Sequence, residues 1–316
     1  MELKHASAPY FRQRESIQSI GLTRLAAAGV LLIPAVIVYG LRALLMTGAG
    51  VLGAVAVEAL WRYIRRADQT IGDLSAAVTG VLLAFNLPST LPLYMVVVGA
   101  FVAIIMTKEL FGGIGKNFAN PAIVGRIFLA VAFPVAMTTF APPQVALSSV
   151  DLLSSATPLA PAANPHSYLE LLLGTHMGVL GETSALALLL GMVFLLYRPV
   201  ITWHIPTAYV GTVALLSLLT GRDPIFQVLS GGLLLGAIYM ATDYSTCPAT
   251  KRGKLVFGIG CGLITCLIRF YGNLNEGVAY SILFMNLLVP YIDQLTPNTP
   301  VGGEGRKRKR GGAAHE

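Results

Sequence analysis

Charge is scarce in this sequence, and that scarcity excludes a soluble domain. Charged residues make up 12% of the 316 residues, 55% are hydrophobic, and the mean hydropathy is +0.70. Soluble domains carry about 25% charged residues. One soluble core could not bury this much apolar surface, so the composition predicts an integral membrane protein.

Cysteine and the common cofactor-binding motifs are also scarce. The three cysteines, Cys247, Cys261 and Cys266, form no CxxC pair, and an Fe–S cluster needs about four thiolates. An ordinary cluster held by this chain alone is therefore excluded, and a disulfide framework is not expected. The stretch GGIGKN lacks the Ser or Thr that follows the lysine of a phosphate-binding loop. The five histidines show no metal-ligand spacing, so no metal site is predicted.

Long apolar runs are what the sequence has in abundance. Runs of about twenty residues, the length that crosses a bilayer, recur along the chain. We therefore expect an all-α polytopic membrane protein with about ten transmembrane helices in two five-helix halves. The first half (22–138) follows a cytoplasmic N-terminal segment, 1–21. A long loop (139–179) joins the first half to the second half (180–295), and a basic tail (296–316) follows the second half. The expected spans are 22–41, 44–61, 72–87, 91–110, 120–138, 180–197, 203–220, 225–242, 255–272 and 277–295.

The basic residues predict the orientation of these spans. With the N-terminus in the cytoplasm, all but Arg42, Arg222 and Arg269 of the 22 lysines and arginines fall on the cytoplasmic side, as the positive-inside rule requires. Both termini are then cytoplasmic, and the loop 139–179 lies outside. The polar N-terminus does not resemble a cleaved signal peptide. We interpret the RKRKR of the tail as an anchor at anionic headgroups rather than a nucleic-acid site.

Each half contains a polar break near the predicted cytoplasmic surface, which suggests an internal duplication. The first break is KELFGGIGKNFANPAIVGR (108–126), and the second is ATDYSTCPATKRGK (241–254). Asn117 and Asn120 are three residues apart, so a helical turn would place them on one face. Asp243 lies at a similar depth and is a candidate functional acid, the alternative being a helix cap at the interface. Lys108 and Glu109 are expected to form an ordinary interfacial pair.

The outer loop contains the small, polar stretch SSATPLAPAANPHS (154–167). Pro158 favours an extended backbone at Thr157, and the small side chain of Ala156 beside it leaves its hydroxyl accessible. An accessible hydroxyl can be a nucleophile or a site of esterification. On chemistry alone, a plain loop threonine is the favoured interpretation.

Taken in order, these motifs resemble a known family. The stretches are GKNFANPA, SSATPL, MATDYSTCP and YGNLNEGVAYSILFMNLLVPYID. With the ten spans they resemble the D subunit of the Rnf complex, the bacterial ion-translocating ferredoxin:NAD oxidoreductase. That subunit is related to the B subunit of the sodium-pumping NADH:quinone reductase.

The resemblance implies a role for the outer loop. In that family the matching threonine carries FMN through a phosphoester bond, which a separate flavin transferase makes on the outer side. Here the attachment residue would be Thr157, with Ser154, Ser155, Ala156 and Pro158 as its recognition context. Ser155 stands where the commoner motif has glycine, a small-for-small difference.

The resemblance also implies roles for the polar breaks. Asn117, Asn120 and Asp243 would lie near a second, non-covalent flavin such as riboflavin, and Asp243 would be a ligand or gate for the coupling ion. The chain would be a multi-pass subunit of the bacterial inner membrane, working with Fe–S and flavin subunits to move Na⁺ or H⁺. It would supply no catalytic side chain and would not be a complete enzyme alone. The alternatives are a ten-helix channel or secondary transporter without flavin, and a structural scaffold.

Overall fold

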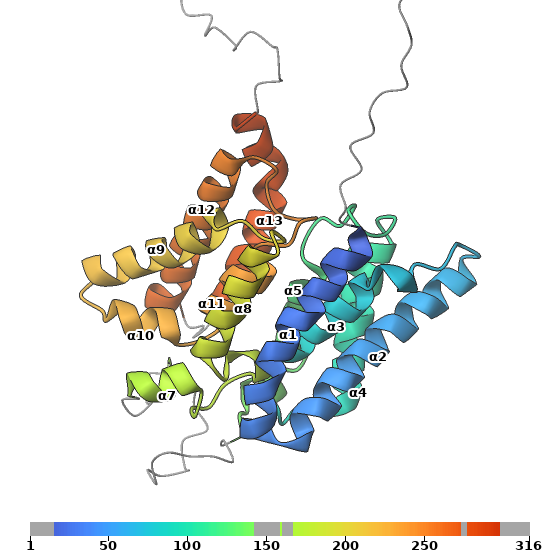
Figure 1. The fold of residues 1–316 in the computed structure, drawn as a ribbon, viewed down its shortest axis with the longest axis horizontal. Helices are drawn as coiled ribbons and strands as arrows, with labels where there is room; N and C mark the ends of the chain where they lie inside the picture. The colour runs from blue at the N-terminus through green and yellow to red at the C-terminus, as the bar shows by residue number, and fades with distance from the viewer. Residues whose placement is uncertain (1–15, 142–158, 160–166, 273–276, 298–316) are drawn as a thin grey trace, which may run out of the picture.

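The computed structural model describes residues 16–141, 159, 167–272 and 277–297, and these are mostly helical (Figure 1). Within these ranges there is no strand, only one isolated bridge between Pro88 and Val179. The helices before the long loop are α1 (Ile17–Tyr39), α2 (Leu41–Ile64), α3 (Ser75–Phe85), α4 (Leu93–Phe101), α5 (Pro121–Ala132) and α6 (Pro134–Thr138). Those after it are α7 (Tyr168–Leu173), α8 (Ala185–Tyr197), α9 (His204–Leu219), α10 (Pro224–Leu229), α11 (Leu233–Leu235), α12 (Lys251–Tyr271) and α13 (Val278–Leu295).

The lengths of these helices support a polytopic membrane protein. By length and composition, four helices in the described part of the chain could cross a membrane: α1, α2, α12 and α13. Four shorter apolar helices, α3, α5, α8 and α9, accompany them. Helical segments lie in each of the ten expected spans. The number of crossings and the side of the termini stay predictions.

The expected spans 225–242 and 91–110 are not regular α-helices. The run 225–242 is broken after α10, where Gly231 has a φ of 67°, in the left-handed region that ends helices. The chain resumes as α11 and a π-helix, η4 (Gly236–Met240). In the run 91–110, α4 passes directly into a second π-helix, η2 (Val102–Glu109).

The two π-helices each precede one of the two polar breaks. Their i→i+5 bonds include Leu110 N to Ile105 O at 3.0 Å and Ala241 N to Gly236 O at 2.7 Å. π-helices are rare and often mark functional sites. Their recurrence before both breaks supports the internal duplication that the sequence suggested.

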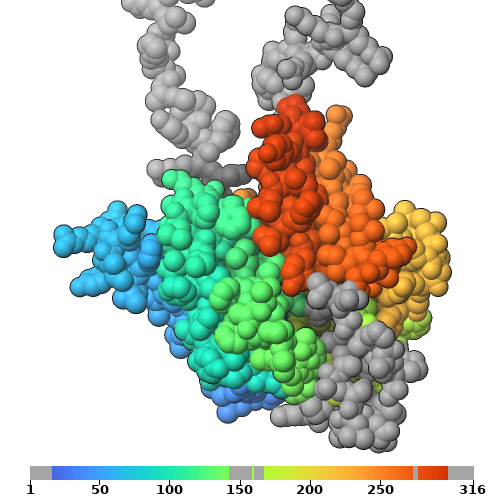
Figure 2. Space-filling view, turned by 180° about the vertical axis from the view of Figure 1, so that it is seen from behind, coloured from blue at the N-terminus to red at the C-terminus, as the bar shows by residue number. Residues whose placement is uncertain are grey.

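Close helix packing depends on glycine at a few crossings. A Cβ on Gly80 of α3 would lie 2.3 Å from the carbonyl oxygen of Gly50 on α2. On α12, Gly258 and Gly262 are spaced as GxxxG and approach the backbone of α9 in the same way. The halves meet where α1 packs against α8 and α5 against α13, and Figure 2 shows α13 beside the segment that contains α5.

Candidate functional site

The two polar breaks meet at one end of the bundle, which we call the break end because it carries residues 110–120 and 241–250. There they form a small cleft, partly open to solvent, between α1, α3 and both breaks. We call it the break cleft and define it by Arg24, Asn117, Asn120, Asp243 and Tyr244. The opposite end of the bundle, with α6, α7 and α10, is the loop end (Figure 1).

The asparagines of the first break bind the second break. Asn120 caps α5, because its Oδ1 accepts from Ala122 N at 3.0 Å, and Pro121 fills the first turn as expected. The Asn120 Nδ2 also donates to Met240 O, at 3.1 Å, at the end of η4. Asn117 Nδ2 donates to Ser245 Oγ at 3.1 Å. Asn120 is therefore both a helix cap and a link between the halves.

The expected helical turn between the two asparagines is wrong, although both side chains line the cleft. The backbone from 110 to 120 is not helical. Gly112, Gly113 and Gly115 have φ values of 104°, 95° and 82°, a region that L-residues with a Cβ rarely adopt. These glycines turn the chain so that Asn117 reaches the cleft from a loop.

Asp243 is held by α1 as well as by its own loop. Its Oδ1 accepts from Arg24 Nη1 at 2.8 Å, and its Oδ2 accepts from Ser245 Oγ at 2.6 Å and Thr246 Oγ1 at 3.2 Å. Arg24 Nη2 also donates to Thr242 O, at 3.0 Å. Both charged residues are buried. Sequence reasoning counted Arg24 only as a topological charge, and a basic residue inside an apolar span was the signal that it has a partner.

The same carboxylate affects a nearby thiol. Cys247 follows Asp243 by one turn, and its backbone N–H donates to the Asp243 carbonyl at 3.0 Å. Burial, reinforced by the Asp243 carboxylate, raises the pKa of the Cys247 thiol to about 11. The thiol is therefore neutral at physiological pH.

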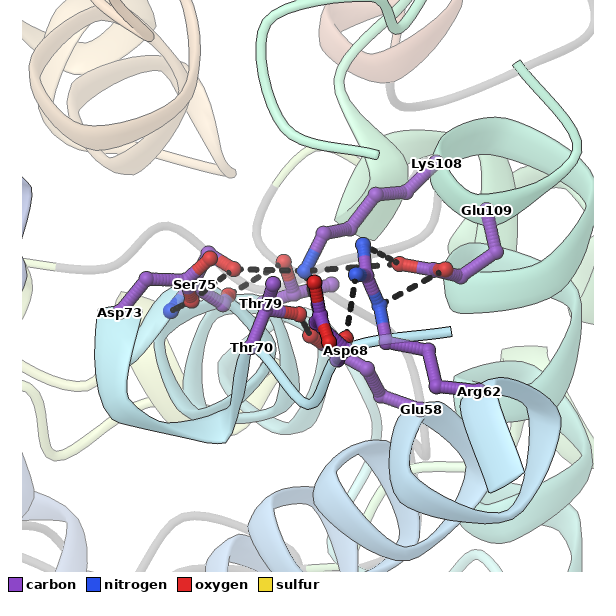
Figure 3. Close-up of polar contacts among 9 residues, drawn as sticks. All are labelled: Glu58, Arg62, Asp68, Thr70, Asp73, Ser75, Thr79, Lys108 and Glu109. Carbon is purple, nitrogen blue, oxygen red and sulfur yellow. Dashed lines mark hydrogen bonds and ion pairs between the residues drawn. The ribbon is translucent and has the colours of Figure 1, made fainter. Parts of the chain in front are cut away.

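A buried ion pair adjoins the break cleft (Figure 3). Lys108, at the end of η2, donates from Nζ to Glu58 Oε2 at 2.7 Å and to Ser75 Oγ at 2.6 Å. Lys108 is 2% exposed and Glu58 0%. Thr70 donates to the other Glu58 oxygen, and Ser75 Oγ donates to Asp73 Oδ1 at 2.5 Å.

The expected pair of Lys108 with Glu109 is present, with charged atoms 4.0 Å apart, but each residue has a closer partner. Lys108 lies closer to Glu58, and Glu109 lies closer to Arg62, whose Nε is 3.1 Å from Oε2. Successive residues of a helix point in different directions, so each neighbour finds its own partner across the bundle. Lys108 and Ser75 both line the break cleft, which places the ion pair in its wall.

Polar contacts continue from the cleft into the bundle through Met240. Asn86 Nδ2 donates to Met240 Sδ at 3.3 Å and to Leu82 O at 2.7 Å. Arg126 Nη1 donates to Asn86 Oδ1 at 2.9 Å. The sequence assigned Arg126 to the cytoplasmic surface, but the side chain is buried within the bundle on α5. Its apolar surroundings in sequence gave no sign of these partners.

The predicted flavin-attachment residue, Thr157, lies outside the described residues, together with Ser154, Ser155, Ala156 and Pro158. Leu159, two positions later, is described. Its Cδ1 lies 2.6 Å from the point that a Cβ on Gly231 would occupy, between α10 and α11 at the loop end. Leu159 thus lies against the bundle at the break in the eighth expected span.

The break cleft contains one acceptor that a bound ligand could use. Asn117 Oδ1 is buried and has no hydrogen-bond partner, so it can accept from a ring N–H. No group of three or more His, Cys, Asp or Glu side chains gathers anywhere in the described residues.

Comparison with known proteins accounts for nearly the whole chain. Residues 4–302 match the model of the NQR2, RnfD, RnfE family. The chain is 43% identical over 303 residues to the D subunit of the Na⁺-translocating ferredoxin:NAD⁺ oxidoreductase complex of Acetobacterium woodii, covering 94% of each chain. It is 39% identical over 319 residues to the D subunit of the proton-translocating ferredoxin:NAD⁺ oxidoreductase complex of Clostridium ljungdahlii, covering 94% of this chain and 95% of that one.

A third relative is less similar but also covers most of this chain. The chain is 34% identical over 342 residues to the D subunit of the ion-translocating oxidoreductase complex of Escherichia coli, covering 94% of this chain and 97% of that one. The chain therefore belongs to the NQR2, RnfD, RnfE family.

Proposed function

We propose that this chain is the D subunit of a bacterial ion-translocating ferredoxin:NAD⁺ oxidoreductase and that it carries FMN covalently on Thr157. In this role it is one subunit of a redox-driven ion pump in the inner membrane. Its partners are the other membrane, Fe–S and flavin subunits, and a flavin transferase that modifies it. The near-complete overlap with relatives that are named as D subunits supports a role for the whole chain rather than for one part.

The observation that carries the proposal is the meeting of the two breaks. Asn120 from one half binds Met240 from the other, and the buried Asn117 Oδ1 beside them has no partner. A buried acceptor without a donor is costly, so this position favours a ligand that brings an N–H. We assign a second, non-covalent flavin, riboflavin or a close analogue, to the break cleft, held by Asn117, Asn120 and Asp243.

The covalent flavin requires one bond to this chain. The ester joins Thr157 Oγ to the phosphorus of FMN, and the net change in the chain is the addition of FMN with the loss of water. When bound, flavin supplies the electron-transfer chemistry that side chains cannot. The chain's own contribution is to hold the two flavins near opposite ends of the bundle.

The polar groups of the cleft suit control of a cation. Asp243 Oδ1 lies 2.8 Å from Arg24 Nη1. A cation that came to lie beside Asp243 would therefore compete with Arg24 for the carboxylate. Buried acids within membrane bundles commonly lie on ion pathways. We assign to Asp243 the role of ligand or gate for the translocated Na⁺ or H⁺, because it is the carboxylate that joins α1 to the second break.

Denaturing gels and intact mass test the covalent flavin. The chain is co-expressed with a flavin transferase, purified, and separated in SDS. We expect a fluorescent band and a mass increase equal to FMN minus water. Thr157→Ala should abolish both, whereas Thr175→Ala, a matched change in the same long loop, should abolish neither.

Each contrary outcome has a defined meaning. A colourless wild-type band of unmodified mass would contradict the covalent proposal and favour the small-solute channel or transporter. A fluorescent Thr157→Ala band would move the attachment site elsewhere. The second flavin is non-covalent, so denaturation should release it. Protein that releases no free flavin on denaturation would refute the assignment of a flavin to the break cleft.

A further inference from the structure

The last motif of the sequence, YGNLNEGVAYSILFMNLLVPYID, places a buried polar side chain in the middle of α13. Asn286 is 3% exposed, and its neighbours in the sequence, Met285 and Leu287, are apolar. A buried amide is costly unless its donors and its acceptor are hydrogen-bonded. The partners of Asn286 therefore have to come from other elements, and the structure provides them from both polar breaks.

One end of the Asn286 amide binds the first break, at the residue that begins α5. Its Oδ1 accepts from the backbone N–H of Asn120 at 3.1 Å. In many helices the N–H of the N-cap residue is bonded by a Glu or Gln side chain three residues later. That position is Ile123 here. Because Ile123 cannot accept a hydrogen bond, the acceptor for the Asn120 N–H is supplied by α13.

The other end of the same amide binds the second break. Asn286 Nδ2 donates to Thr246 O at 3.1 Å. The Thr246 hydroxyl donates to Asp243 Oδ2 at 3.2 Å, and its backbone N–H donates to Asp243 O at 3.2 Å. In this orientation the amide oxygen meets a donor and the amide nitrogen meets an acceptor. One side chain is therefore joined directly to Asn120 and, through Thr246, to Asp243.

Asn286 lies behind the break cleft and not in its wall. Among the described residues, those that line the cleft include Asn120 and Asp243 but not Asn286. The two breaks also contact each other, because Asn120 Nδ2 donates to Met240 O, and α13 packs against α5. A substitution at Asn286 would therefore change how the two breaks are held without removing a group that faces the cleft.

We propose that Asn286 is the positioning residue of the break cleft. It fixes the spacing between Asn120 of the first half and Asp243 of the second half, and so sets the affinity of the cleft for its ligand without touching that ligand. The inference rests on the proposed function, because the ligand assigned to the cleft is a non-covalent flavin. An amide suits this task, since it presents a donor and an acceptor on one planar group.

Riboflavin binding tests this role in the full chain. The protein is expressed without a flavin transferase, purified in a maltoside detergent and dialysed to remove free flavin. The Kd for added riboflavin is measured from the change in its fluorescence. One buried hydrogen bond corresponds to about tenfold in an equilibrium constant. We expect Asn286→Leu, which loses both bonds, to raise this Kd by about tenfold or more. A residue with a merely structural role would lower the unfolding temperature but leave the Kd of the folded protein unchanged.

Hydrogen–deuterium exchange tests the contact itself without a ligand. Peptides that cover residues 116–124 report on the Asn120 N–H, which loses its acceptor in Asn286→Leu and should exchange about tenfold faster. Asn286→Ala loses the same bonds but leaves room for water, so it keeps the test valid if Asn286→Leu does not fold. Gln294→Leu makes a matched change at an exposed amide of α13 and should alter neither the Kd nor the exchange rate.

The outcomes are distinct. A Kd for riboflavin that is the same in both Asn286 variants as in Gln294→Leu would overturn the proposal, and so would unchanged exchange in residues 116–124. Wild-type protein that binds no riboflavin would refute the assignment of a flavin to the break cleft, and the role of Asn286 would fall with it. That failure appears in the wild type, whereas failure of the positioning role alone appears only in the variants.

Discussion

Removing the charge of Lys108 is expected to destabilise the bundle more than any surface substitution. The ammonium is 2% exposed and donates to Glu58 and Ser75 at 2.7 and 2.6 Å. Lys108→Met leaves the Glu58 carboxylate, which is 0% exposed, with only the Thr70 hydroxyl as a donor. Removing one partner of a buried ion pair costs about 3–5 kcal/mol. At about 2–3 °C per kcal/mol for a chain of this size, the apparent unfolding temperature should fall by about 6–15 °C.

The measurement is thermal unfolding of the purified protein in one detergent, with a double-mutant cycle. Lys116→Met, at an exposed lysine of the same break, should change stability by no more than about 0.5 kcal/mol. The double variant Glu58→Gln/Lys108→Met removes both charges and should recover about 2–3 kcal/mol relative to the sum of the single effects. A Lys108→Met protein as stable as the Lys116→Met control, or a double variant with no recovery, would refute the buried pair.

Two other predictions concern helix packing and the break-cleft thiol. Gly80→Ala places a Cβ 2.3 Å from the Gly50 carbonyl and should cost at least about 1–3 kcal/mol, whereas Gly48→Ala meets nothing within 4 Å and should leave thermal stability no lower. Equal effects would contradict the close crossing. Because the pKa of Cys247 is raised to about 11, its alkylation by iodoacetamide, followed by peptide mass, should still accelerate above pH 9, where an ordinary thiol is already ionised. Asp243→Asn removes the carboxylate that disfavours the thiolate, so the profile should move to lower pH; an unmoved profile would exclude that influence.

The positions of the helices and the breaks could be predicted from sequence because they depend on local composition. Apolar runs specify helices in a membrane, since every backbone group must be bonded internally. Asn117, Asn120 and Asp243 were expected at similar depth, and the structure brings them to one cleft. The hydropathy of 225–242, however, gave no sign of the break at Gly231, whose φ of 67° is a property of the backbone.

Partners across the bundle could not be predicted. Lys108 lies near the end of a π-helix, whose i→i+5 bonds change the residues per turn. The 3.6-residue period therefore gives the wrong face for its side chain, and its closest acid is Glu58 on α2 rather than its sequence neighbour Glu109. Arg24 and Arg126 each pair with residues brought close only by packing of distant helices, which no local pattern encodes.

The bond between Arg24 and Asp243 has a consequence for biosynthesis. It joins residues 219 positions apart. At a synthesis rate of about 5–20 residues per second, Arg24 is made about 10–45 s before Asp243. During that interval a charged arginine sits in an apolar helix without its carboxylate. Insertion of α1 must therefore rely on the translocon, lipid headgroups or another subunit to hold that charge, and the break cleft forms only when synthesis is nearly complete.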